Sequence, residues 1–255
     1  MKTSNKILLS GAIFVISLFL AFTLYSRKFI KKNDTQRYVK SGILENKVFL
    51  DSYESDTLYI RDIDCKLDPN STQISVEVDK TFLSFMKLKN YRGIYPYHEY
   101  PKGNTYFSVP STYTIGVKGK TNLVIISKKR SHVYSEEKLN IENLRIEANN
   151  DSSVSIDNDG QSLIFIGKNN ASADIEGSFK TAEISCEYRS RIDAMTISFE
   201  SLELNLSENS FARVKHAQNI SGEMEDYAEF ETVETCDVSG IEYFDHAKHK
   251  LESWD

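Results

Sequence analysis

Five consecutive segments between Asn143 and Thr232 repeat one pattern of apolar and polar side chains. Each segment begins with a run in which every second residue is apolar or small, and successive runs start 19, 19, 20 and 18 residues apart. The runs are Leu144, Ile146, Ala148; Leu163, Phe165, Gly167; Ala182, Ile184, Cys186; Leu202, Leu204, Leu206; and Ile220, Gly222, Met224. A period of this length is the signature of a repeat architecture, and it constrains the fold more than any other feature.

A second alternating pair follows each first run at a constant distance. It starts six residues after the last member of the first run in all five segments, so the variation in period falls between segments. The pairs are Val154, Ile156; Ala173, Ile175; Ile192, Ala194; Ala212, Val214; and Phe230, Thr232. This spacing predicts a tight corner within each segment and a loop of variable length between segments.

The corner between the two runs has one position that is occupied only by serine or alanine. Its members are Ser152, Ala171, Ser190, Ser210 and Ala228. The residues before it are polar, and Asn, Asp and Ser favour bends because their side chains bond nearby backbone groups. We therefore expect a tight bend with a small side chain turned inward.

Alternation with a period of two places one set of side chains on one face of a strand. Two short strands per segment bury that face only when successive segments stack. The pattern therefore predicts an all-β fold, a right-handed parallel β-helix or solenoid over residues 141–240. An antiparallel sandwich with coincidental spacing is the alternative. In the solenoid, the column of inward side chains is Leu144, Leu163, Ala182 and Leu202.

The segments on either side of the repeats are predicted to close the solenoid. An end coil exposes apolar side chains and an unpaired strand edge, so it needs a cap. Residues 48–140 contain alternating runs such as Ile74 to Val78, and they are expected to form a β-rich cap region. Residues 241–255 are highly charged, and we expect them to form a C-terminal cap that includes a short helix.

The repeats resemble the auto-transporter adhesin head (GIN) domain family. The stretches that carry the resemblance are "LRIEANNDSSVSID", "LIFIGKNNASADIE", "AEISCEYRSRIDA" and "LELNLSENSFARV", and it extends from about Val48 to the C-terminus. The resemblance implies a parallel β-helix-like fold on an exported or cell-envelope protein of bacteria, with no defined biochemical role. This sequence departs from the family in lacking Gly-Ser-Gly corners.

Residues 7–25 carry no charged side chain and would span about 28 Å as a helix, enough to cross a bilayer core. They are predicted to be a transmembrane signal anchor between a tail, 1–6, and a juxtamembrane linker, 26–47. A cleaved signal peptide is the alternative. The basic residues at 27–32 favour a cytoplasmic body by the positive-inside rule, whereas the resemblance implies export. We expect an exported body, on the periplasmic or cell-surface side.

Composition and motifs exclude several classes of function. The formal net charge of −6 does not indicate a nucleic-acid partner, because phosphate binding calls for a basic surface. Cys65, Cys186 and Cys236 have neither metal-ligand nor redox spacing. No Ser-His-Asp set, glycine-rich phosphate loop or Cys-His pair stands in a recognisable context. The sequence therefore predicts a protein that is not an enzyme and binds no cofactor.

A tyrosine-rich segment before the repeats is a candidate contact surface for a protein or glycan partner. A tyrosine ring is apolar and its hydroxyl is polar, which suits it to such contacts. The alternative is that these rings fill the open end of the solenoid. The candidate residues are Tyr91, Tyr95, Tyr97, Tyr100, Tyr106 and Tyr113.

Two further groups of side chains are candidate sites. Asp174 and Asp193 occupy equivalent outward positions, and adjacent coils lie about 4.8 Å apart, so the two carboxylates are expected to be neighbours. Such a pair could bind calcium or act in acid-base catalysis, although a solvated face relieved by Arg213 is the simpler interpretation. His246 and His249 have a spacing that suits metal ligands on a helix, but a charged tail contains this spacing by chance.

These observations lead to one main hypothesis and two alternatives. The main hypothesis is a membrane-anchored cell-envelope protein whose β-solenoid is a non-catalytic binding, adhesion-like or scaffolding surface. The first alternative is a self-assembling cytoskeletal solenoid, similar in architecture to bactofilins. The second is a carbohydrate-active β-helix enzyme that uses Asp174 and Asp193.

Overall fold

The computed structural model describes residues 43–90, 93–99 and 111–251. They belong to one compact unit, Lys40–Glu99 with Pro110–Asp255. The other unit, Met1–Val39 with Tyr100–Val109, lies outside the described residues, and so does the predicted anchor at 7–25. In the part of the chain that is described, no helix combines the length and the apolar character needed to cross a bilayer.

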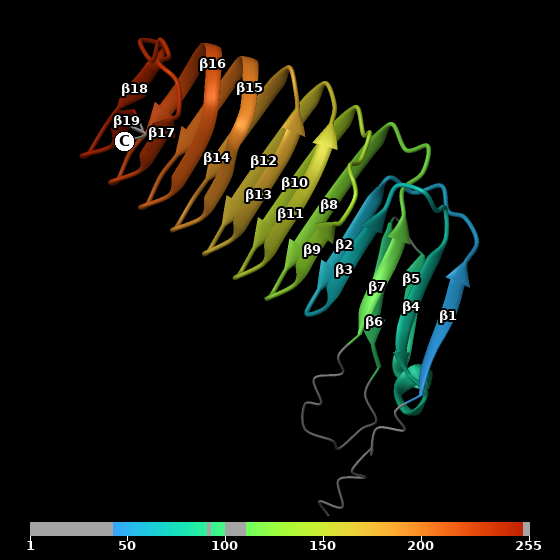
Figure 1. Ribbon diagram of the computed structural model, residues 1–255. Coiled ribbons are helices and arrows are strands. Elements are labelled where there is room, and N and C mark those ends of the chain that lie inside the picture. Colours follow the sequence, from blue (N-terminus) through green and yellow to red (C-terminus); the bar gives the residue numbers. More distant parts are fainter. Residues whose placement is uncertain (1–42, 91–92, 100–110, 252–255) are drawn as a thin grey trace, which may run out of the picture. The chain divides into compact units, whose positions relative to one another are not determined.

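Parallel strands form a stack of coils with two faces, and each coil contributes one strand to either face (Figure 1). The first face contains, in stacking order, β2 (Thr57–Arg61), β8 (Asn122–Lys128), β10 (Asn143–Asn149), β12 (Ser162–Lys168), β14 (Thr181–Cys186), the C-terminal parts of β15 (Arg191–Leu206) and β16 (Phe211–Met224), and β18 (Ile241–Tyr243). The second face contains β3 (Asp64–Asp68), β9 (His132–Ser135), β11 (Ser153–Asp159), β13 (Ser172–Ser178), the N-terminal parts of β15 and β16, β17 (Glu229–Thr232) and β19 (Lys248–Leu251).

The register of the strands confirms the predicted stack of repeats. Leu144 pairs with Leu163, which pairs with Ala182, and Ala182 pairs with Leu202, all in parallel strands. These four side chains are at most 7% exposed, so they form one buried column. The parallel pairing excludes the antiparallel sandwich for the repeats. The hand of the coil stays a prediction.

The corner that joins the two faces repeats one backbone conformation. Two successive residues have positive φ angles in each repeat, for example 56° and 60° at Asn150 and Asp151. The small residue that follows is buried in every repeat, as predicted. In the first repeat, the Ser152 hydroxyl donates a hydrogen bond to the Ser127 carbonyl (3.1 Å) and accepts one from the Asn149 amide (2.8 Å). The serine thus links the corner to the preceding coil.

Parallel pairing continues on both sides of the predicted solenoid region, 141–240. On the N-terminal side, β8 pairs with β10 and β2 pairs with β8, so two further coils precede the recognised repeats. On the C-terminal side, β18 and β19 add another coil. The expected short helix after residue 240 is therefore wrong for the described residues, because Ile241–Tyr243 and Lys248–Leu251 extend the two faces as strands.

Among the described residues, the antiparallel strand pairs all lie at the N-terminal end of the stack. Within it, β4 pairs with both β1 and β7, β5 pairs with β6, and β7 also continues the second face by parallel pairing with β3. The change from parallel to antiparallel pairing ends the regular coils there. The elements are β1 (Leu44–Leu50), β4 (Ile74–Asp79), the 3₁₀ helix η1 (Lys80–Phe85), β5 (Met86–Asn90), β6 (Ile94–His98) and β7 (Thr112–Gly116).

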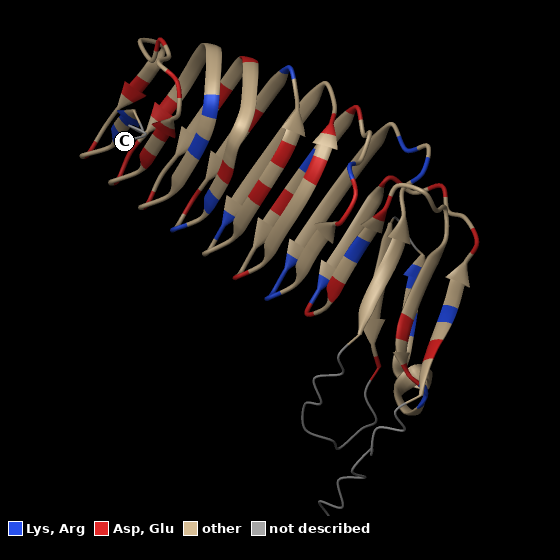
Figure 2. Cartoon of the chain, viewed as in Figure 1, with Lys and Arg blue, Asp and Glu red and all other residues tan. Residues whose placement is uncertain are grey.

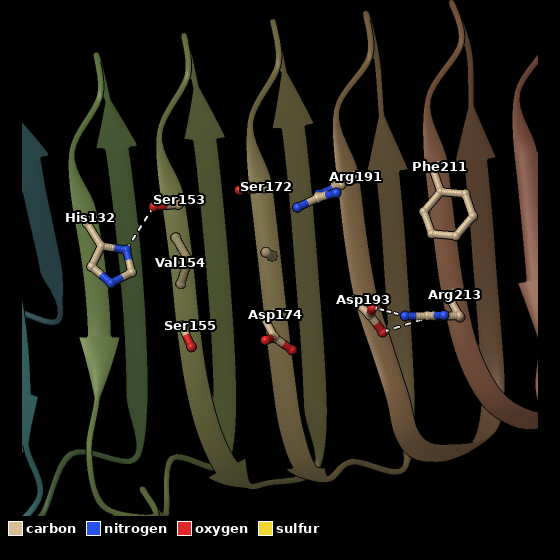
Figure 3. Close-up of a pocket in the computed structure, with 11 residues that line it drawn as sticks. His132, Ser153, Val154, Ser155, Ser172, Asp174, Arg191, Asp193, Phe211 and Arg213 are labelled. Atoms are coloured by element: carbon tan, nitrogen blue, oxygen red, sulfur yellow. Dashed lines mark hydrogen bonds and ion pairs between the residues drawn. The ribbon is translucent and has the colours of Figure 1, made fainter.

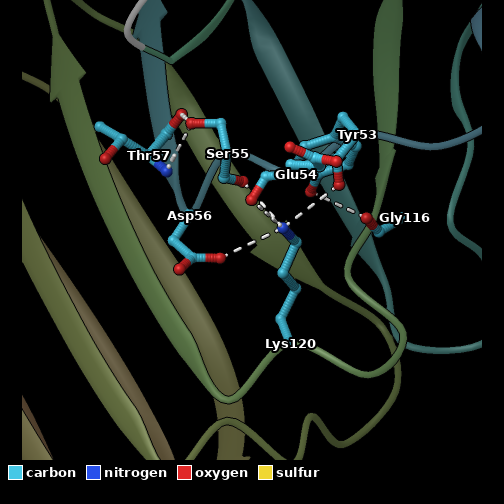
Figure 4. Close-up of polar contacts among 7 residues, drawn as sticks. All are labelled: Tyr53, Glu54, Ser55, Asp56, Thr57, Gly116 and Lys120. Atoms are coloured by element: carbon cyan, nitrogen blue, oxygen red, sulfur yellow. Dashed lines mark hydrogen bonds and ion pairs between the residues drawn. The ribbon is translucent and has the colours of Figure 1, made fainter.

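Lys120 fastens the connection between β1 and β2 (Figure 4). Its ammonium donates to the carbonyl oxygens of Tyr53 (3.3 Å), Glu54 (3.0 Å) and Ser55 (2.9 Å), and lies 3.1 Å from a carboxylate oxygen of Asp56. It also lies 4.5 Å from the centre of the Tyr53 ring. Four oxygens and an aromatic face therefore surround the Lys120 ammonium. These contacts hold in place the loop between β1 and β2, which has no regular secondary structure.

Asn158 supplies hydrogen bonds that the strands cannot make. Its side chain is fully buried, accepts a hydrogen bond from the Ile141 amide (2.8 Å) and donates one to the Ile141 carbonyl (3.0 Å). We predict that Asn158→Leu lowers the free energy of unfolding by about 2–6 kcal/mol, because two buried backbone groups lose their partners at about 1–3 kcal/mol each. Urea denaturation of the full chain, followed by circular dichroism, measures this change.

Asn143→Leu is the matched control for Asn158→Leu. Asn143 donates to the Asn122 side chain at 2.8 Å, but at the exposed surface. Its replacement should change the free energy of unfolding by less than about 0.5 kcal/mol. Equal losses in the two variants would show that the buried amide has no special role.

The environment of His98 predicts a dependence of stability on pH. His98 hydrogen-bonds Ser111 at 3.0 Å and stacks on Tyr113, and its burial lowers its pKa below the ordinary histidine value. The unfolded chain therefore takes up this proton at higher pH than the folded chain, so stability is lost as the pH falls through the histidine range. We predict that the loss between about pH 7.5 and pH 5.5 is smaller in His98→Gln. Identical pH profiles from urea denaturation would contradict this role.

Candidate ligand-binding face

The outward side chains of the second face form two parallel rows, because the coils stack in register. The inward positions between them hold buried residues such as Val154 and Ala173. The first row is His132, Ser153, Ser172, Arg191 and Phe211. The second row is Tyr134, Ser155, Asp174, Asp193 and Arg213.

A depression of about 370 Å³ lies on these rows, and we call it the trough. Figure 3 shows its small side chains, Ser153, Ser155 and Ser172, between His132 on one side and Arg191 and Phe211 on the other. Short side chains leave the sheet surface low, while long ones on the flanking coils raise its edges. The trough therefore results from the order of small and large residues along the rows.

His132 lines one end of the trough and stacks on Tyr134, its neighbour on the same strand. The rings of His132 and Tyr134 stack with their centres 5.2 Å apart and their planes 16° apart. His132 also shares a hydrogen bond of 2.8 Å between its Nδ1 and the Ser153 hydroxyl. These two contacts fix the orientation of the imidazole. A flat, partly apolar surface thus stands beside the serine side chains.

The register places Asp174 beside Asp193, but their partners differ. Asp193 accepts hydrogen bonds from Arg213, with Nε at 3.2 Å and Nη2 on the other oxygen, and from the Met195 amide at 3.2 Å. The Asp174 carboxylate is exposed and makes no hydrogen bond or ion pair with the described residues. Both oxygens of Asp193 are therefore occupied, and Asp174 is the carboxylate that a ligand can reach.

Arg191 is the second charged group in the trough that is available to a ligand. Its guanidinium makes no hydrogen bond or ion pair within the described part of the chain, and its side chain is exposed. Arg191 lies on the coil next to Asp174, opposite Ser172. A carboxylate and a guanidinium on adjacent coils thus face the same trough, which can bind groups that both donate and accept hydrogen bonds.

Only some of the tyrosines predicted to form a contact surface lie within the described residues. Tyr95 and Tyr97 are half-buried on β6 with their rings stacked at 5.8 Å, and the Lys89 ammonium lies 4.9 Å from the Tyr97 ring. The remaining candidates, Tyr91, Tyr100 and Tyr106, lie outside the described residues. The partner surface of which they are part stays a prediction.

Tyr113 was predicted to belong to the contact surface, but it is fully buried and belongs to the core. Its strand, β7, lies between β3 and β4, which covers both of its edges. The hydroxyl lies within hydrogen-bonding distance of the carbonyls of Tyr97 (3.0 Å) and Lys87 (3.2 Å). These contacts hold the β5–β6 pair against β7.

The cysteine and histidine side chains pack against or bond to other parts of the protein. Burial raises the pKa of the Cys65 and Cys186 thiols above the ordinary cysteine value, which makes them poor nucleophiles. His246 stacks on Tyr227 at 4.8 Å, whereas His249 hydrogen-bonds the Thr232 hydroxyl at 3.0 Å. The two histidines thus have separate partners. Within the described residues, no group of three or more His, Cys, Asp or Glu side chains is placed to hold a metal ion.

The trough was not predicted from the sequence, in part because the coil of β8 and β9, which carries His132, does not share the repeat period. Leu123 and Val133 on that coil stand 21 residues before Leu144 and Val154, their partners in the stack. This step is longer than those of the five recognised repeats, and the second run is short. The alternation of "TNLVII" followed by "HVYS" was the available signal.

Comparison with known proteins identifies a family and a fold. A family model described as "Putative auto-transporter adhesin, head GIN domain" matches residues 61–233. Among curated proteins, none matches the sequence.

Several solved structures share the fold at low sequence identity. A putative adhesin from Bacteroides fragilis is 14% identical with a TM-score of 0.62, and the match covers 83% of this chain and 97% of that chain. A putative lipid binding protein from Parabacteroides distasonis is 12% identical with a TM-score of 0.60, covering 84% and 98%. A putative adhesin from the same species is 14% identical with a TM-score of 0.56, covering 83% and 97%. At these identities the likeness concerns the fold alone.

We predict that Asp174 and Asp193 do not form a calcium site. Calcium takes six to eight oxygen ligands, and both oxygens of Asp193 are engaged by Arg213. Calorimetric titration of the full chain with calcium chloride should therefore give the same result for the unmodified protein and for Asp174→Ala. Glu176→Ala, on the same strand, is the control. A calcium signal lost only in Asp174→Ala would contradict the prediction.

Proposed function

This chain belongs to the auto-transporter adhesin head GIN domain family, and from that premise we propose that it is a membrane-anchored cell-envelope protein with a non-catalytic binding surface. The β-solenoid is the binding or scaffolding part, with an adhesion-like role. The predicted helix at 7–25 attaches it to the membrane, and the linker at 26–47 separates the two. The body faces the periplasm or the cell exterior.

The trough is the observation that carries this proposal. It sits on a stack whose outward positions are set by backbone pairing, so the points from which its side chains project are fixed before any ligand arrives. Such preorganisation lowers the entropy that a binding surface loses on association. Asp174 and Arg191 expose charges that have no partner among the described residues, so both are available to a ligand.

The chemistry of the trough supports binding more than catalysis. A glycosidase needs two carboxylates that both act on the substrate. Here Asp193 is bound by Arg213 and by the Met195 amide, which leaves Asp174 without a catalytic partner on the neighbouring coil. The similar solved structures are described as adhesins and as a lipid binding protein, in agreement with a binding role.

The charge distribution supports a partner other than nucleic acid. Figure 2 shows acidic and basic residues interspersed along the coils, without a continuous basic stripe on the face that it displays. The formal net charge of the whole chain is −6. Phosphate backbones are bound by clustered lysine and arginine, so a protein or glycan partner fits this surface better.

Protease accessibility tests the location of the body. We expect a C-terminally tagged full chain to resist protease in intact Gram-negative cells or to be cut at the cell surface, and to be degraded in spheroplasts. Deletion of residues 7–25 should leave the body in the cytoplasm and protect it. A cytoplasmic marker protein that stays intact serves as the control.

Complete protection of the full chain in spheroplasts would overturn the proposed location. Filaments of the protein on the cytoplasmic side, seen by electron microscopy in the same cells, would instead support the bactofilin-like alternative.

A further inference from the structure

We propose that the trough binds an uncharged glycan chain that runs along the stacking direction, across the coils of β9, β11, β13 and β15. The inference deepens the proposed function, on which it rests, by giving the binding surface a ligand class. It depends on the unpaired charges in the trough, on its hydroxyl groups, on its aromatic ends and on its length.

The two unpaired charges favour a ligand rich in hydroxyl groups. Asp174 can only accept hydrogen bonds, and Arg191 can only donate them. A sugar hydroxyl does both, so neighbouring hydroxyls on one ring can donate to the carboxylate while others accept from the guanidinium. Charge-assisted hydrogen bonds of this kind are about twice as strong as neutral ones. A single uncharged ligand class thus satisfies both groups.

The base of the trough adds polar groups without adding charge. Ser155 and Ser172 have no side-chain hydrogen bond to the described residues, and their hydroxyls are half-buried. Each hydroxyl can donate one hydrogen bond and accept others. Because these side chains are short, they let a ligand approach the sheet closely and contact it through hydroxyl groups.

Aromatic side chains stand at both ends of the serine-lined part. The His132 ring, which stacks on Tyr134, lines one end, and the half-buried Phe211 lies beside Arg191 at the other. The C–H groups on one side of a pyranose ring form an apolar face, which packs on a flat aromatic ring. An aromatic end therefore suits a sugar unit better than it suits a small inorganic ion.

The dimensions suit a short chain. From His132 to Arg191 the first row spans three coil spacings, about 14 Å at about 4.8 Å each. The volume of about 370 Å³ falls within the range of about 300–1,000 Å³ for small-molecule sites. An extended oligosaccharide would place successive sugar units over successive coils.

Other ligand classes fit these groups less well. An acidic glycan would pair with Arg191 but be repelled by Asp174, whose charge no described residue compensates. A free amino acid matches the two charges, but it is too short to reach the aromatic ends of the rows. An acyl chain needs an apolar lining, whereas seven of the eleven residues that line the trough are serine, aspartate or arginine.

The test uses the full chain, purified from membranes in detergent micelles. It is applied to an array of neutral and acidic oligosaccharides, and the neutral tetrasaccharides that bind are then titrated by calorimetry. Oligogalacturonate and glycine are titrated as the acidic and zwitterionic probes. We expect neutral tetrasaccharides to bind, and oligogalacturonate and glycine to give no heat.

Three variants place the binding in the trough. Asp174→Ala and Arg191→Ala should each weaken neutral glycan binding about ten-fold or more, since each removes charge-assisted hydrogen bonds. Ser172→Tyr should abolish binding by filling the trough from its middle. Glu176→Ala, on the same strand but outside the trough, is the matched control and should bind as the unmodified protein does. Circular dichroism spectra verify that each variant is folded.

The outcomes separate this inference from the proposed function. Binding of oligogalacturonate or glycine in place of neutral glycans would overturn the ligand class, and neutral binding that survives all three variants would overturn the site. Binding of no probe would overturn the inference even when the protease experiment finds the body exported. A body that stays in the cytoplasm would overturn the proposed function, whatever the calorimetry gives.

Discussion

Backbone hydrogen bonds between successive coils, which keep equivalent residues in register within each face, are the interaction on which the rest of this structure depends. At the start of the second face, the amides of Ser153, Ser172 and Arg191 donate to the carbonyls of Ser131, Ser152 and Ala171, at 2.9–3.0 Å. A shift of one residue would turn every inward side chain outward. The same bonds that align the buried column therefore also align the outward rows, so the core and the candidate binding face share one constraint.

The trough shows how a regular scaffold acquires a local site. The backbone of each coil is nearly the same, so differences between coils reside in the side chains. Where the rows change from serine to arginine and phenylalanine, the surface rises, and where Arg213 follows Asp193, a charge is compensated. In the same row, Asp174 lies between Ser155 and Asp193, and neither side chain can compensate its negative charge. The shape and the charge of the trough thus depend on which residues follow one another along each row.

Much of the fold could be predicted from the sequence, because the inward positions of a solenoid repeat at a constant spacing. Leu144, Leu163, Ala182 and Leu202 lie in one column for this reason. The candidate site was harder to predict from the sequence. His132 belongs to a coil with a longer step, and Tyr113 became part of the core through antiparallel pairing with β4, which no local pattern indicates. Which charges remain unpaired depends on contacts across coils, so Arg191 was not singled out.

The arrangement around Lys120 has a consequence for the conditions in which the N-terminal end of the stack stays ordered. Carbonyl and carboxylate oxygens around a positive charge resemble the ligands that proteins use for hard metal ions. Here the cation is part of the polypeptide. Chelators cannot remove it, and a scarcity of divalent ions cannot deplete it. The loop between β1 and β2 is therefore independent of the mineral content of the surrounding medium.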